Sequence, residues 1–139
     1  MKVLFDTNII MDVLLDRKPF AENASYLLSK VELTEMNGFI CATTVTTIHY
    51  LLSKYLSKKK AVESIHSIMD LFEVASVNRL VIENALRSKF DDFEDSVLHE
   101  AARHAGAMYI ITRNIKDFKK SKIPVFTPLE FLNMLESLD

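Results

Sequence analysis

Short apolar runs alternate along the chain with longer segments in which apolar residues recur every three or four positions. Short apolar runs are typical of buried strands, and the longer spacing is typical of amphipathic helices. Strands are predicted at 3–5, 39–42, 72–75, 109–112 and around Val125. Helices are predicted between them, over 9–18, 21–37, 45–55, 62–69, 77–88 and 91–106, and from Pro128 onward. Alternating strands and helices indicate the α/β class, with a parallel sheet covered on both faces.

Length and composition predict a single globular domain over residues 1–139. The chain is 49% hydrophobic and 26% charged, and its two glycines and three prolines leave no low-complexity linker. Gly38 is the expected stop of the second helix. The single cysteine, Cys41, excludes an internal disulfide and indicates a reducing, cytoplasmic setting. No apolar run approaches the ~20 residues that span a bilayer, so we expect a soluble protein without membrane contact.

The net charge of −2 argues against nucleic-acid binding through bulk electrostatics. Local contacts remain open, because basic residues cluster twice along the chain. The clusters are Lys54 with Lys58, Lys59 and Lys60, and Arg113 with Lys116, Lys119, Lys120 and Lys122. Most lysine clusters are simply solvated surface, so only proximity to an acidic site gives one of them a functional meaning.

Asp6 ends the first apolar run and is followed by Thr7 and Asn8. Two interpretations are open. Asp6 can be a helix cap or turn residue, since aspartate is common in both positions. It can also be a functional carboxylate, because ligands of open α/β sheets bind at the carboxyl ends of the strands.

Further acids are expected at the same edge of the sheet. The strand at 109–112 leads into Asn114 and Asp117, so a second strand also ends in polar and acidic residues. Asp95 falls at the margin of the apolar stripe of the helix over 91–106. Asp92, one turn earlier, is better explained as a cap, because the N-terminus of a helix favours negative charge.

Three carboxylates in one cleft repel one another and raise at least one pKa, unless a cation lies among them. Oxygen ligands without a cysteine or histidine cluster suit Mg²⁺ or Mn²⁺ better than Zn²⁺. Such an ion can polarise a phosphodiester and help to activate water. The pattern therefore predicts metal-assisted phosphodiester hydrolysis at Asp6, Asp95 and Asp117. Nothing in the sequence indicates a nucleophilic triad or a glycine-rich phosphate loop.

These segments resemble the PIN-domain family, and most closely its small single-domain toxin members. The resemblance is carried by residues 3–8, by Asp95 at the start of an alanine-rich helix, and by residues 109–114 with Asp117 and Phe118. It implies a three-layer α/β/α sandwich with a central, mostly parallel sheet. It also implies an endoribonuclease dependent on Mg²⁺ or Mn²⁺, frequent homodimers, and a cognate antitoxin protein.

By position, the resemblance makes Asp6, Asp95 and Asp117 the catalytic and metal-binding acids. Thr7, Asn8, Asn114, Asp92 and His49 then have supporting positions, while Arg113 and Lys116 contact RNA.

The chain departs from the family on the helix after the second strand, where the family usually carries a glutamate. Residues 43–50 contain no acid, and His49 is the nearest candidate replacement. A lone histidine is more often a packed or hydrogen-bonded residue than a ligand. Two functions therefore remain open: a metal-dependent ribonuclease, and a weak or inactive module that binds RNA or a protein partner.

Overall fold

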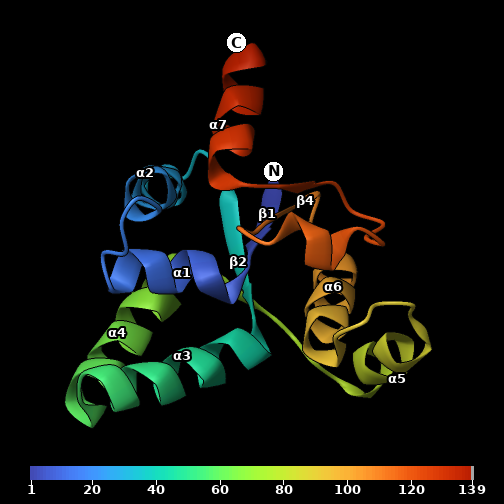
Figure 1. The fold of residues 1–139 in the computed structure, drawn as a ribbon, viewed down its shortest axis with the longest axis horizontal. Coiled ribbons are helices and arrows are strands. Elements are labelled where there is room, and N and C mark those ends of the chain that lie inside the picture. The colour runs from blue at the N-terminus through green and yellow to red at the C-terminus, as the bar shows by residue number, and fades with distance from the viewer. Residues whose placement is uncertain (139) are drawn as a thin grey trace.

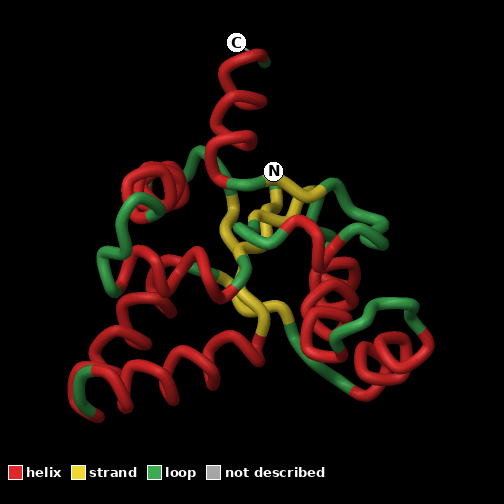
Figure 2. Tube along the Cα trace, in the orientation of Figure 1, coloured by secondary structure: helices red, strands yellow, loops and turns green. Residues whose placement is uncertain are grey.

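A computed structural model describes residues 1–138. Its centre is a five-stranded sheet in the order β3-β2-β1-β4-β5, and every strand pair is parallel. The strands are β1 (Lys2–Phe5), β2 (Asn37–Cys41), β3 (Glu73–Ala75), β4 (Tyr109–Ile111) and β5 (Val125–Phe126). The predicted α/β fold with a parallel sheet is confirmed, and all five predicted strands are present (Figures 1 and 2).

Seven α-helices and one short 3₁₀ helix, η1, surround the sheet in the described part of the chain. They are α1 (Thr7–Leu14), α2 (Ala21–Glu32), α3 (Ala42–Tyr55), α4 (Lys58–Leu71), α5 (Arg79–Arg87), α6 (Phe93–Ala105), η1 (Ile115–Phe118) and α7 (Pro128–Ser137). The sequence predicts each α-helix but not η1. Within residues 1–138, no helix is long and apolar enough to cross a membrane.

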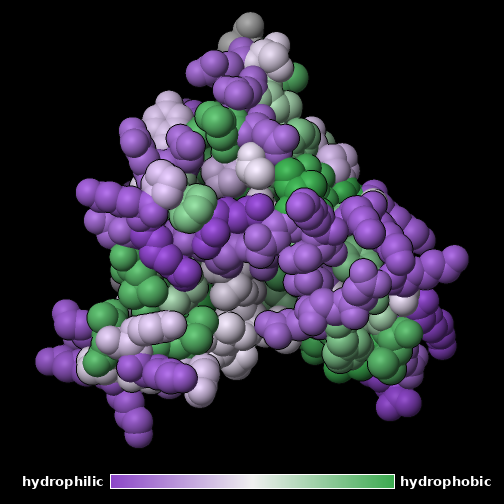
Figure 3. Space-filling model, viewed as in Figure 1, coloured by the Kyte–Doolittle hydropathy of each residue, from purple (hydrophilic) through white to green (hydrophobic). Residues whose placement is uncertain are grey.

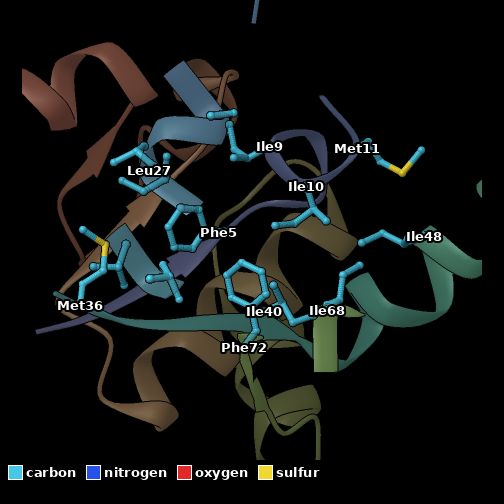
Figure 4. Packing of buried hydrophobic residues seen from close by; sticks show 14 of the residues in the cluster. Phe5, Ile9, Ile10, Met11, Leu27, Met36, Ile40, Ile48, Ile68 and Phe72 are labelled. Atoms are coloured by element: carbon cyan, nitrogen blue, oxygen red, sulfur yellow. The ribbon is translucent and has the colours of Figure 1, made fainter. Parts of the chain in front are cut away.

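Alternation along the strands divides the interior into two apolar cores, one on each face of the sheet. Val3 and Phe5 of β1 point to one face, where they pack with residues of α1 to α4 and α7 (Figure 4). Leu4, between them, points to the other face and packs with residues of α5 and α6. Successive strand residues face opposite sides, so a parallel sheet buried on both sides needs apolar residues at every position. The result is the predicted α/β/α sandwich.

The second helix is shorter than predicted. It ends at Glu32 rather than near Asn37, because Thr34 adopts a positive φ of 58° that an α-helix cannot contain. Asn37 and Gly38 instead begin β2, so the prediction of Gly38 as a helix stop is wrong. At Gly38 an added Cβ would lie 2.8 Å from side-chain atoms of both Val31 and Phe72. Glycine is therefore required here for close packing of β2 beneath α2.

Candidate active site

The candidate site lies where β1 and β4 end side by side. The strand order reverses at β1, so its carboxyl end borders a topological switch point, the usual ligand position in open α/β sheets. Phe5 pairs with Ile111, which brings the next residues, Asp6 and Thr112, together. The surface is hollowed below this edge, between the α3–α4 side and the α5–α6 side (Figures 1 and 3).

Asp6 is held by three donors at this edge. Its Oδ1 accepts from the Thr7 backbone N–H at 2.7 Å, and its Oδ2 accepts from the Thr112 hydroxyl at 2.8 Å. The Asn8 side-chain amide adds a longer contact of 3.4 Å to Oδ2. Asp6 is thus the N-cap of α1, as one interpretation of the sequence expected, and it is also oriented by a side chain from the neighbouring strand.

Burial governs the charge state of Asp6. Its exposed fraction is 8%, and desolvation raises its pKa. The hydrogen bonds from Thr112 and Thr7 oppose that rise, whereas the charges of Glu94 and Asp117 add to it. Carboxylates from α6 and η1 therefore act on Asp6 across the hollow.

Asn8 and Asn114 connect the two strand ends further. Asn8 accepts from the backbone N–H of Arg113 at 3.3 Å and donates to Thr112 Oγ1 at 3.4 Å. The backbone N–H of Asn114 also donates to Thr112 Oγ1, at 3.1 Å. Because Thr112 Oγ1 accepts these bonds, its own hydrogen is left to point at Asp6.

Asp95 lies in the first turn of α6, half-buried, and Asp92 is the N-cap of that helix. Asp92 accepts from the Asp95 backbone N–H at 3.0 Å, so its interpretation as a cap is confirmed. Burial, followed by the charges of Asp6, Asp92 and Asp117, raises the pKa of Asp95 from 3.8 to about 7. Asp95 therefore holds its proton to a much higher pH than an ordinary aspartate does.

No lysine or arginine within residues 1–138 forms an ion pair with Asp6, Asp95 or Asp117. The three acids belong to different elements, and Asp117 is exposed on η1. In addition to burial, the charge of Asp117 raises the pKa of both Asp6 and Asp95, and the charge of Asp6 also raises that of Asp95, which indicates one shared region of negative charge. Across the described residues, however, no three His, Cys, Asp or Glu side chains are arranged so that they could hold one ion.

The helix after β2 contributes one hydroxyl group, that of Thr44, to the site in place of an acid. Thr44, buried in the first turn of α3, forms a hydrogen bond of 2.9 Å with the Thr7 hydroxyl. His49 is exposed on the same helix, and within residues 1–138 it makes no hydrogen bond or ion pair with any site residue.

The Arg113 side chain lies against α1, and its contact with RNA stays a prediction. Its guanidinium donates two hydrogen bonds, of 2.7 and 3.1 Å, to the fully buried Asp12 of α1. It also lies 3.9 Å from the centre of the Phe20 ring. Arg17 adds a second charge contact to Asp12 at 3.3 Å. Arg113 thus ties the end of β4 to α1, while Lys116 remains exposed on η1.

A sequence model of the PIN domain matches residues 2–116, which include all of β1 to β4. The chain belongs to the PIN domain family. Ribonuclease VapC1 of Aquifex aeolicus is 29% identical to this PIN domain over 145 residues, covering 99% of the chain and 97% of that protein.

Solved structures share the fold of this PIN domain. A toxin-antitoxin complex from Klebsiella pneumoniae has a chain that is 25% identical, with a TM-score of 0.68 over 91% of this chain and 97% of that one. FitAcB from Neisseria gonorrhoeae is 22% identical, with a TM-score of 0.71 over 91% and 98%. The α/β/α arrangement is therefore common to all three.

Sequence reasoning missed four residues of the PIN domain site: Thr112, Thr44, Glu94 and Asp12. Thr112 ends an apolar strand as Asp6 does, so its place at the strand end was a usable signal. Thr44 and Glu94 are recognised only once their helices are positioned. A buried Asp12 could not be foreseen, because its partner Arg113 is 101 residues away.

Proposed function

We propose that this PIN domain is a metal-dependent endoribonuclease that uses Mg²⁺ or Mn²⁺. The observation that carries the proposal is the buried, hydrogen-bonded Asp6, which shares unbalanced negative charge with Asp95 and Asp117. Charge of this kind, offered by oxygen atoms alone, suits a hard divalent cation. The similarity to a protein named as a ribonuclease supports RNA as the substrate.

The donor set fits such an ion even though three acids are not gathered around one point. Mg²⁺ in proteins is commonly bound by one or two carboxylates, with waters and substrate phosphates completing its coordination. Asp6 is the best candidate ligand, because Thr112 and Thr7 fix both of its oxygens. Asp95 and Asp117 are the remaining candidates from α6 and η1.

When bound, the ion would polarise the phosphodiester and lower the pKa of a water molecule. The protein's own residues would hold the metal-binding carboxylates and orient them. The buried Thr112 keeps Asp6 in one rotamer, and Asn8 keeps the ends of β1 and β4 in register. Asp95 must lose its proton before it can bind a cation, and a nearby cation lowers its pKa.

A cognate antitoxin protein is proposed as partner, since the Klebsiella pneumoniae neighbour is a toxin-antitoxin complex. The acidic hollow at the carboxyl edge of the sheet would be the surface that an antitoxin has to block. A homodimer and a cytoplasmic location complete the proposal.

The alternative function is binding of RNA or protein without cleavage. It is favoured by one observation: α3 presents the neutral Thr44 at the site, and the acid-free stretch 43–50 leaves the metal with fewer ligands. A site with fewer carboxylates binds a divalent ion less tightly.

Incubation of purified protein with end-labelled RNA and Mn²⁺ or Mg²⁺ tests the proposal. We expect cleavage that EDTA stops, and that Asp6→Asn reduces at least about 100-fold, because several kcal/mol of metal catalysis is lost. Asp70→Asn, the same change on the exposed surface of α4, is the matched control and keeps full activity. Binding of RNA without cleavage under either metal would favour the alternative function.

A further inference from the structure

A cavity of about 670 Å³ lies outside the acidic site, on the α5–α6 side of the sheet. It is bounded by α5, by the loop that follows α5, by α6, and by the segment after η1. Its polar lining includes Asn84, Arg87, Lys89, Arg103, Lys120 and Lys122. Hydrophilic side chains gather in Figure 3 over the region where Figure 1 places α6 and the segment between β4 and α7.

The cavity is strongly basic in a protein whose overall charge is −2. Five of its lining residues are arginine or lysine, whereas Glu100 is its one acid. Arg103 donates to both Glu100 oxygens, at 3.1 and 3.3 Å, and so neutralises that acid. Four further cations line the same cavity, which points to an anionic ligand.

His99 adds a buried donor to the wall of the cavity. Its exposed fraction is 2%, and its ring is stacked on Phe90 at 4.7 Å. The Lys122 backbone N–H donates to His99 Nε2 at 3.0 Å, so the hydrogen of the neutral ring is on Nδ1. Burial lowers the pKa of His99, which favours this neutral form.

The Nδ1–H of His99 has no hydrogen-bond acceptor among residues 1–138. The nearest carboxylate oxygen, on Glu100, is 3.9 Å away, which is too far for a hydrogen bond, and it is already paired with Arg103. Buried donors are nearly always satisfied in proteins. An unpaired donor on the wall of a cationic cavity is best explained by an acceptor that arrives with a ligand.

We propose that this cavity binds a backbone phosphate of the RNA strand, at a subsite beside the cleavage site. The inference rests on the proposed ribonuclease function and specifies how the substrate is held. Arg87 and Lys89 from one side and Lys122 from the other contact the phosphate oxygens. His99 is stacked on Phe90 in the wall, and a small shift of the lining side chains would let its buried Nδ1–H donate to the phosphate.

Position along the chain favours RNA over an acidic protein segment. His99 follows Asp95 by one turn of α6, and Lys120 follows Asp117 by three residues. Because residues four apart lie on the same face of a helix, a strand that lies across Asp95 can continue along α6 toward the cavity. Phosphate contacts of this kind position a nucleic acid without reading its sequence.

Binding is tested in the Asp6→Asn background with EDTA, so that the result does not depend on cleavage. The probe is a fluorescein-labelled single-stranded RNA whose Kd is measured at several salt concentrations. Arg87→Ala/Lys89→Ala should raise Kd about tenfold and flatten the slope of log K against log salt by about 0.7, which is the loss of one phosphate contact on a single strand. Both side chains are exposed, and we expect unchanged thermal unfolding.

Lys58→Ala/Lys59→Ala is the matched control, because it removes the same charge from the exposed start of α4. An equal loss of affinity in the two double variants, or no loss in either, would overturn the proposal. Loss of poly-glutamate binding with RNA binding intact would also overturn it, and would assign the cavity to an acidic protein. Absence of cleavage by the unmutated protein would refute the ribonuclease and leave this binding test valid.

Discussion

The raised pKa of Asp95 reflects its burial and the acidic side chains that surround it. A half-buried carboxyl beside three other acids is energetically unfavourable when ionised, which is why its pKa lies near 7. The fold therefore favours the protonated form. A cation bound beside Asp95 would favour the carboxylate instead.

The stability of the protein should fall as pH rises, because of Asp95. Its pKa is about 7 in the folded state and about 3.8 when unfolded. The stabilising contribution of the protonated group is therefore complete below about pH 4 and is lost as pH rises through about 7. Burial raises the pKa of Asp6 in the same direction. Urea unfolding at pH 5 and pH 8, without metal, measures the difference.

Asp95→Asn should remove most of this pH dependence and raise the free energy of unfolding at pH 8 by about 1 kcal/mol. Solvent screening of a half-buried group keeps the gain well below the full value of the pKa shift. Asp91→Asn, at an exposed position in the preceding loop, is the control and should change little. Unfolding free energies that are the same at both pH values would contradict the raised pKa.

At the residue scale, the sequence was informative where local order determines the environment. Asp6 was predictable because it ends an apolar strand, and Asp92 because it precedes a helix. The hydroxyl of Thr112 on Asp6 depends on the pairing of β1 with β4, which are 106 residues apart at this contact. The site roles of Asp95, Asp117 and Asn114 stay predictions.

The connection between β4 and η1 is held in place by a side chain from another element, Asp12 of α1. Arg113 is the middle residue of this connection, and its guanidinium is held by Asp12 on α1 and stacked on Phe20. The backbone N–H of Arg113 donates to Asn8. The ion pair therefore fixes the loop that presents Asn114 and Asp117 to the site.

Arg113→Ala should destabilise the protein by about 3 kcal/mol, because it leaves the buried Asp12 with only the longer contact to Arg17. Arg113→Lys should restore only part of this, since a lysine cannot donate two parallel hydrogen bonds. Chemical denaturation measures both changes. Arg79→Ala breaks an exposed pair with Glu83 and is the control, expected to cost less than about 0.5 kcal/mol. Equal costs for Arg113→Ala and Arg79→Ala would show that the buried pair is not structural.

Element types were predictable throughout, but several boundaries were not: α1 ends at Leu14 rather than near residue 18, α4 begins at Lys58 rather than Val62, and α2 ends at Glu32. Period and apolar runs identified every strand and α-helix, because each has to bury one face or both. The end of α2 depends on the backbone conformation of Thr34, for which threonine carries no local signal. The short η1 has too few residues for a periodic pattern to emerge.

Close packing between β2 and its neighbours links the elements into one molecule. Gly38 in β2 leaves room for Val31 of α2 and for Phe72, which follows α4. Phe72 also contacts Phe5 of β1 edge-on at 5.5 Å. The core on this face of the sheet is thus continuous from α2 through the strands to α4.

Gly38→Ala should cost about 1–3 kcal/mol, because the new methyl group overlaps two side chains in a filled core. In a Val31→Ala background the added cost should be smaller, since truncation of Val31 provides room for the methyl. A double-mutant cycle by urea unfolding measures the coupling. Strictly additive costs would show that the overlap is relieved elsewhere.

The central position of β1 has a consequence for how the protein is made. Val3 pairs with Tyr109 in the sheet, and Asp6 accepts a hydrogen bond from Thr112, which is synthesised 106 residues later. Pairings so distant along the chain form late, because a long loop has to close first. A growing polypeptide on the ribosome therefore carries Asp6 for most of synthesis without a finished acidic centre. An unfinished copy therefore lacks the contact between Asp6 and Thr112 on which the proposed ribonuclease site depends.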